Sequence, residues 1–145
     1  MLRQLTVFIE NKNGRLAALC RTLSDHNINM SALMLADTDE FGIVRIICED
    51  PQKAQDVLHK SGYSSAVNDV LGIQVSDEVG GLAEVLSIFE EASLAIEYAY
   101  CFSRESIDAR SAVVVIKTGK DQNEYANQVL SDCKVRLLNQ EDLQG

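Results

Sequence analysis

The sequence lacks any pair of cysteines at the CxxC spacing, so a zinc knuckle or a thioredoxin-type redox site is not expected. The cysteines are instead interpreted as fillers in or near the hydrophobic core: Cys20, Cys48, Cys101 and Cys133. Histidine is also scarce. His26 and His59 are both predicted at the C-terminal ends of helices, where they interact with the helix dipole.

Positive charge is in short supply. The chain of 145 residues has 13 Lys and Arg against 22 Asp and Glu, for a net charge of −9. Such a surface repels phosphate backbones, so neither nucleic acid nor an anionic membrane is an expected partner. The first residues, MLRQLTVFIENK, hold too short an apolar stretch for a signal peptide or a spanning helix. A cytoplasmic location is therefore expected by default.

Signatures of catalysis are missing as well. The sequence contains neither GxGxxG nor GxxxxGK[ST], so a nucleotide site has no support. An enzyme needs a nucleophile beside a base, a metal cluster or a cofactor loop. The many carboxylates have the spacing of solvated helix faces. We therefore expect no catalytic residue, no metal and no cofactor.

What the sequence does have is an internal repeat. The phrase ENKNGRLAAL returns later as SDEVGGLAEV. When Gly14 is aligned with Gly80, apolar positions of the following segments coincide, as for Leu23 with Phe89. The second copy has an insertion near SRESIDAR, so the residues that follow it align with the first copy at a larger offset. Similarity of this kind predicts two copies of one supersecondary unit.

The first copy is predicted to fold as βαββαβ. Apolar residues at 16, 19, 20 and 23 have helical spacing, and Asn13 is expected to be the N-cap of that helix, which ends near Asn27. Asp50 and Pro51 predict the N-cap and first residue of a second helix. A turn is expected at ADTDEFG. Strands are expected at residues 5–9, 28–36, 43–49 and 65–68.

The second copy repeats this order. Its strands are expected at residues 71–75, 94–102, 112–116 and 134–138, with helices over the stripe 82–89 and over 121–131. The predicted class is α+β: two ferredoxin-like βαββαβ units packed side by side, their antiparallel sheets pairing into one larger sheet with helices on one face. The residues from Ser64 to Val70 are expected to join the copies without a flexible linker.

The second strand of each copy has apolar residues on both faces. In the first copy, Leu33 and Leu35 lie on one face of the strand and a second set of apolar residues lies on its other face. In the second copy, Ala99 and Cys101 lie opposite a second apolar set in the same way. Such strands are usually covered on both sides, so an edge pairing that buries them is expected. Aromatic residues on the second of these strands either fill the core of their own copy or face a ligand: Tyr98, Tyr100 and Phe102.

The loop before each first helix has the chemistry of an anion site. A glycine at a strand-to-helix turn lets a ligand approach the backbone closely, and the first N–H groups of the helix have no partner within it. These groups favour a carboxylate, to which Asn11 and Asn13 can add hydrogen bonds. The alternative is that Gly14 and Gly80 serve only the turn and Asn13 only the cap.

Both copies resemble ACT domains, the small regulatory modules of amino-acid metabolism. The resemblance rests on a strand, a loop that ends in Gly-x-Leu-Ala, a helix and an Asn-Ile-Asn phrase, read in ENKNGRLAALCRTLSDHNINMSAL and repeated in SDEVGGLAEVLSIFEEASLAIEYAY. It implies a stand-alone tandem of two such domains, residues 1–68 and 69–145. It also implies a free amino acid held where the loop of one domain meets the second strand of the other.

Carried over by position, this resemblance implies one ligand site of eight residues: Asn11, Asn13, Gly14, Arg15, Leu16, Ile96, Glu97 and Tyr98. Glu97 would meet the α-amino group of the ligand. A second site is implied at the mirror positions: Asp77, Val79, Gly80, Gly81, Leu82, Met30, Ser31 and Ala32. The second loop lacks the amides of the first, so the first site is expected to be the tighter one.

Two functions follow from the resemblance. The first is a non-catalytic sensor that binds a free amino acid and then presents a changed surface to an amino-acid metabolic enzyme or to a second copy in a homodimer. The second is a ligand-free assembly module for such an enzyme, in which the loops are only turns and the apolar strands drive dimerisation. The identity of the amino acid is not encoded in any motif.

Overall fold

A computed structural model of the protein describes residues 1–37, 40–105 and 110–144. These form two compact units. One contains Met1–Leu2 and Asp69–Asp142, and the other contains Arg3–Asn68 with the C-terminal residues from Leu143. The centres of the predicted ADTDEFG turn and of the SRESIDAR insertion lie outside the described residues.

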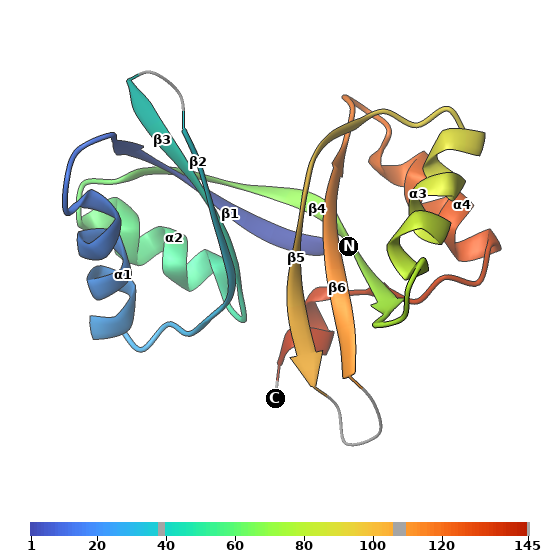
Figure 1. The fold of residues 1–145 in the computed structure, drawn as a ribbon. Coiled ribbons are helices and arrows are strands. Elements are labelled where there is room, and N and C mark those ends of the chain that lie inside the picture. Colours follow the sequence, from blue (N-terminus) through green and yellow to red (C-terminus); the bar gives the residue numbers. More distant parts are fainter. Residues whose placement is uncertain (38–39, 106–109, 145) are drawn as a thin grey trace. The chain divides into compact units, whose positions relative to one another are not determined.

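The first repeat has the predicted βαββαβ order (Figure 1). Its elements are β1 (Leu2–Glu10), α1 (Arg15–Asp25), β2 (Met30–Asp37), β3 (Phe41–Cys48), α2 (Pro51–Lys60) and the first part of β4 (Ser64–Ser76). Strand β3 pairs antiparallel with both β1 and β2, and the hydrogen-bonded order is β2-β3-β1-β4. This is the ferredoxin-like arrangement that the sequence predicted.

The second repeat has the same topology. The later part of β4 is its first strand, followed by α3 (Gly81–Glu91), β5 (Ile96–Glu105), β6 (Arg110–Thr118), α4 (Asn123–Asp132), β7 (Leu137–Leu138) and the short 3₁₀ helix η1 (Gln140–Leu143). Strand β6 lies between β4 and β5, and β7 pairs with the other side of β4. Because β4 runs through both repeats, the seven described strands belong to one antiparallel sheet.

Each repeat has its own hydrophobic core between the helices and one face of the strands. In the first repeat, alternate residues of β1 and β3 pack against α1 and α2, and the core consists of Leu5, Val7, Ile9, Leu19, Leu23, Val44, Ile46, Cys48, Ala54 and Leu58. In the second repeat the corresponding core is built around Phe89. The period-two alternation of the strands thus sets which side chains face the helices and which face away.

The helix ends follow the local sequence in most places. The Asp50 carboxylate accepts a hydrogen bond from the Lys53 N–H at 3.0 Å, and Pro51 is the first helical residue, as predicted. Helix α1 ends before Asn27, whose φ of 61° is the predicted left-handed conformation. The prediction that Asn13 caps α1 is wrong. Gly14 occupies the cap position with a φ of 83°, and no side chain there makes a capping hydrogen bond.

The prediction that the second strands are covered on both faces is also wrong. Strands β2 and β5 stand at the two ends of the strand order. Leu33 and Leu35 keep 38% and 48% of their surface exposed, and Ala99 and Cys101 are exposed as well. An end strand has only one neighbour, and the helices of its repeat pack over the inner strands instead. Each repeat therefore has an end strand with exposed apolar side chains.

The aromatic residues of β5 do not fill the core beneath the helices of their repeat. Tyr98, Tyr100 and Phe102 pair with Lys117, Val115 and Val113, which alternate with the core residues of β6. The period-two alternation places them on the sheet face away from the helices, where all three are half-buried. The interpretation of these aromatics as fillers of that core is therefore wrong.

Candidate functional site

The loop between β1 and α1 is a tight turn. The Lys12 N–H donates to the Glu10 carbonyl at 2.8 Å, and the Arg15 N–H donates to the Lys12 carbonyl at 3.2 Å. Gly14 then takes a φ of 83°, a left-handed conformation that most other residues adopt only with strain. The N–H of Arg15, the first residue of α1, therefore already has an acceptor, and the N–H groups of Leu16 and Ala17 are the ones at the helix start that have no acceptor within the helix.

Opposite charges gather beside this turn. The Glu10 Oε2 atom lies 3.1 Å from Lys12 Nζ and 3.4 Å from Arg15 Nη2. The hydrogen bond from Lys12 and the charges of Lys12 and Arg15 lower the pKa of the Glu10 carboxyl, which favours its ionised form. All three side chains are more than half exposed, so each ion pair contributes little to stability and is readily exchanged.

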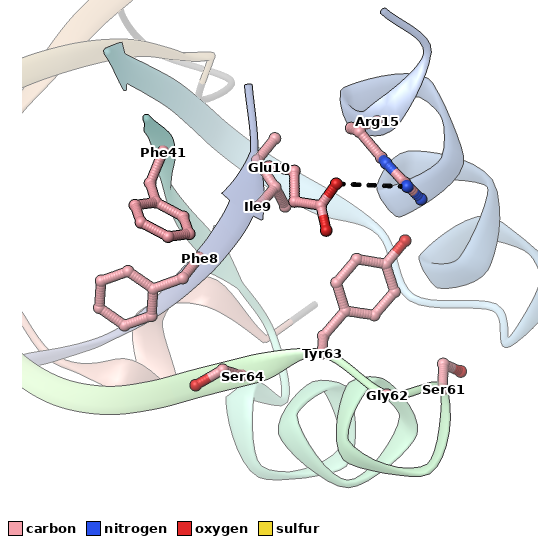
Figure 2. A pocket seen from close by; sticks show the side chains of 9 residues that line it. All are labelled: Phe8, Ile9, Glu10, Arg15, Phe41, Ser61, Gly62, Tyr63 and Ser64. Carbon is pink, nitrogen blue, oxygen red and sulfur yellow. Dashed lines mark hydrogen bonds and ion pairs between the residues drawn. The ribbon is translucent and has the colours of Figure 1, made fainter. Parts of the chain in front are cut away.

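A cleft of about 370 Å³ opens at this end of the first repeat (Figure 2). It is lined by Phe8, Ile9, Glu10, Arg15, Phe41, Ser61, Gly62, Tyr63 and Ser64. The figure shows the Phe8 and Phe41 rings side by side, while the Tyr63 hydroxyl points toward Glu10 and Arg15. The cleft thus has an aromatic part and a part with one charge of each sign. Its volume falls in the range of small-molecule sites, about 300–1,000 Å³.

The residues predicted for the first site divide into two sets. Asn11, Asn13, Gly14, Arg15 and Leu16 lie together in the β1–α1 loop and the first turn of α1, but only Arg15 lines the cleft. Ile96, Glu97 and Tyr98 lie in the other unit, at the start of β5, where the strand register shifts between Ile96 and Tyr98. The Glu97 Oε2 atom is 3.9 Å from Lys117 Nζ. That the two sets meet stays a prediction.

Sequence reasoning missed the aromatic lining of the cleft. Phe8 occupies a β1 position that faces away from the helices and is 44% exposed, and Phe41 is 52% exposed at the start of β3. The alternation of β1 signals that Phe8 points outward, as a large apolar side chain on the polar face of its strand. Tyr63 had no comparable signal, because its place depends on the path of the chain after α2.

The second loop repeats the turn with different side chains. Gly80 has a φ of 90°, and Val79 and Leu82 are exposed. Gly81 is buried, and a Cβ atom there would lie only 2.6 Å from the Ser76 carbonyl oxygen. The groove beside it, about 450 Å³, is lined by Gln74, Val75, Ser76, Asp77, Glu78, Ser111 and Arg136.

The mirror set of the second site lies in the other unit, at the start of β2. Met30 is partly buried against the first core, Ser31 is exposed and Ala32 is half-buried. The register between β2 and β3 shifts between Met30 and Ala32, as it does at the start of β5. Bulges of this type often adjoin functional sites. The contact of these residues with the second loop also stays a prediction.

The cleft of the first repeat and the groove of the second occupy equivalent places in their repeats, but their lining residues differ in chemistry. Glu10 pairs with Phe41 across the first sheet, and Ser76 pairs with Ser111 at the same place in the second. Gln74 stands at the position of Phe8 when the two glycine loops are aligned. Among the described lining residues of the two sites, the pair Phe8 and Phe41 and the ion pair of Glu10 with Arg15 are therefore found in the first repeat and not in the second.

The cysteines have unequal environments. Cys48 is fully buried in the first core, as predicted, whereas Cys101 and Cys133 are exposed, so their interpretation as core fillers is wrong. Burial raises the pKa of the Cys48 thiol to about 11 from a usual value of 9.0. Among the described residues, no cluster of His, Cys, Asp and Glu could hold a metal ion.

We expect thiol labelling to reflect this difference. At pH 8, an aromatic disulfide reagent should react quickly with Cys101 and Cys133 and slowly with Cys48 until the chain unfolds. Equal labelling rates for Cys48 and Cys101 in the folded protein would contradict the prediction, and a Cys48→Ala variant identifies the slow phase.

The raised pKa of Cys48 also affects the stability of the fold. The stability gained by keeping this thiol neutral is complete below pH 9 and is lost as the pH rises toward 11.

The comparisons with known proteins agree with the repeated fold. The whole chain, residues 1–145, matches the family model described as "ACT domain pair". The chain belongs to this ACT family. No curated protein matches it. A crystal structure of protein BT0572 from Bacteroides thetaiotaomicron is 37% identical, with a TM-score of 0.87 over 98% of this chain and 94% of that one.

Two more distant structures share the ACT-pair fold. The regulatory subunit of aspartate kinase from Thermus thermophilus, in a ligand-free form, is 14% identical, with a TM-score of 0.58 over 90% of both chains. The corresponding subunit from Thermus flavus is 16% identical, with a TM-score of 0.60 over 92% of this chain and 94% of that one. In the described part of this chain, every helix is too short or too polar to cross a membrane.

Proposed function

We propose that this ACT domain pair is a non-catalytic regulatory protein that binds a free amino acid at the loop between β1 and α1. The observation that carries the proposal is the cleft beside Gly14, in which Glu10 and Arg15 present one negative and one positive charge 3.4 Å apart. A free amino acid has the complementary pair of charges on its α-carbon. The Thermus subunits, which share this fold, support a regulatory role, and the partner would then be an enzyme of amino-acid metabolism.

The geometry allows the ligand to replace the ion pair. Because Glu10 and Arg15 are both about half exposed, water screens their mutual attraction, and its loss on binding is small. The α-carboxylate would accept hydrogen bonds from Arg15 and from the first N–H groups of α1, and the α-ammonium group would pair with Glu10. Regulation then requires that the ligand bind one of two states of the protein more tightly than the other.

Calorimetric titration with each of the twenty amino acids tests this proposal. We expect at least one to bind, and we expect Arg15→Ala to weaken that binding about 10-fold or more, because a charge-assisted hydrogen bond is lost. Arg21→Ala is the matched control, since Arg21 is an exposed arginine of the same helix outside the cleft. If no amino acid produces heat or a thermal shift, or if the two variants behave alike, the proposal is wrong.

The exposed apolar side chains of the end strands favour a second candidate, a ligand-free assembly module. Leu33 and Leu35 on β2 present apolar surface at the end of the sheet, a feature that often marks an interaction site. Sedimentation velocity over a range of concentrations separates the two functions. Self-association that amino acids leave unchanged, together with calorimetric silence, favours assembly.

A further inference from the structure

The first cleft contains a continuous aromatic surface next to its charged end. Glu10 pairs with Phe41 across the sheet, and Phe8 pairs with Ile43 on the same face. Phe8 and Phe41 are therefore diagonal neighbours, and Figure 2 shows their rings side by side. Both lie about half exposed, so an apolar group placed on them would be removed from water together with the two rings.

We infer that the cleft is specific for an amino acid with an aromatic side chain. This inference rests on the proposed function and concerns the same site. The ligand's α-ammonium and α-carboxylate groups lie at Glu10 and Arg15, and its ring lies on Phe8 and Phe41. Phe8 and Glu10 are two residues apart on β1, which is about 7 Å along a strand. The charged part and the aromatic part of the cleft are therefore built on neighbouring positions of one strand.

The charges that line the cleft exclude the other classes of amino acid. Glu10 and Arg15 are its charged residues, and both are taken by the α-groups of the ligand. A lysine ligand would carry a third, positive charge for which the lining offers no partner, so it would be desolvated at a cost. An aspartate ligand has no apolar group to place on the two rings. A serine ligand would leave the two rings in water. Offset or edge-to-face contacts between rings favour an aromatic side chain over an aliphatic one of similar size.

The second repeat serves as an internal reference for this assignment. Gln74 and Ser111 stand where the first repeat has Phe8 and Phe41, and Gly81 stands at the position of Arg15. The second groove therefore has neither the aromatic surface nor the ion pair. A Phe8→Gln, Phe41→Ser double variant gives the first repeat the residues that the second repeat has at these two positions. It removes the proposed recognition surface by substitutions that the fold already accepts at equivalent places.

Calorimetry with the whole chain tests the inference, with L-phenylalanine, L-tyrosine, L-leucine, L-serine, L-lysine and L-aspartate as probes. We expect phenylalanine or tyrosine to bind at least 10-fold more tightly than the other four. The double variant should lose at least 10-fold in affinity for the aromatic ligand. A Phe41→Leu variant, which keeps an apolar surface, should lose the preference for aromatic over leucine while still binding leucine. Tyr125→Ser, at an exposed aromatic position outside the cleft, is the matched control.

The outcomes separate this inference from the proposed function. If serine, lysine or aspartate binds as tightly as phenylalanine, and Arg15→Ala weakens that binding, the proposed function stands and the aromatic specificity is overturned. If Tyr125→Ser reduces the affinity as much as the double variant does, the specificity is also overturned. If none of the twenty amino acids binds, both are overturned. Circular dichroism and thermal unfolding establish that each variant is folded, and the Phe41→Leu result decides the matter should the double variant not fold.

Discussion

Phe89→Ala is expected to lower the free energy of unfolding by about 3–5 kcal/mol, the cost of removing a large aromatic side chain from a packed core. Phe89 is 1% exposed and is the largest fully buried side chain in the described residues. It lies on α3 in the core of the second repeat, among residues of β4, β6 and α4. Alanine would leave a cavity that the surrounding strands and helices can close only in part. Urea unfolding followed by circular dichroism measures the loss.

The duplication supplies a matched comparison for this variant. Leu23 is the equivalent residue of the first repeat, and Leu23→Ala should cost about 2–5 kcal/mol because the side chain is fully buried. Tyr125→Ala, at a position that is 56% exposed on α4, should change stability by less than about 0.5 kcal/mol. A loss below about 1 kcal/mol for Phe89→Ala would show that the second core is not packed as described.

Gly81→Ala is expected to destabilise the protein by about 1–3 kcal/mol, although alanine normally favours a helix over glycine. The added Cβ atom would lie 2.6 Å from the Ser76 carbonyl oxygen and 2.9 Å from Ser76 Oγ. A carbonyl oxygen of the backbone cannot turn aside as the end of a long side chain can. Either the start of α3 or the end of β4 must therefore move. Thermal unfolding of the variant against the parent protein measures the effect.

The equivalent position in the first repeat provides the control for this substitution. Arg15 already carries a Cβ atom at the first residue of α1, so Arg15→Ala introduces no new contact there. We expect Arg15→Ala to leave the free energy of unfolding nearly unchanged, apart from the loss of the weak surface ion pair with Glu10. Similar melting temperatures for Gly81→Ala and the parent protein would mean that the second turn is looser than described.

Much of the fold could be predicted from local sequence because local rules decide it. A helix is indicated by the spacing of Leu19 and Leu23. Its end is indicated by Asn27, which takes the left-handed conformation, and the start of α2 is indicated by Asp50-Pro51. None of these signals requires knowledge of distant contacts. The N-cap of α1 could not be predicted in this way. Asn13 has a suitable side chain, but the left-handed Gly14 takes the cap position, and the local sequence allows both.

The candidate site could be predicted only in part, for a similar reason. The Gly14 loop and Arg15 were identified because they are contiguous in the sequence. The aromatic surface depends on the pairing of Glu10 with Phe41, and this register is set by contacts between strands that are distant in the chain. Tyr63 reaches the cleft only because α2 returns the chain to the same end of the repeat. Long-range register carries no signature in a single sequence.

The continuity of β4 fixes how the junction between the repeats can change. Val67 packs against the first core, and Leu71, Ile73 and Val75 belong to the second, all at odd-numbered positions of one strand. Side chains alternate strictly along such a strand, so one inserted or deleted residue between Val67 and Leu71 would turn one set of these side chains to the wrong face. A one-residue change of length at this junction therefore reverses the face of β4 that one set presents relative to the other, whereas an ordinary linker between tandem domains has no such alternation.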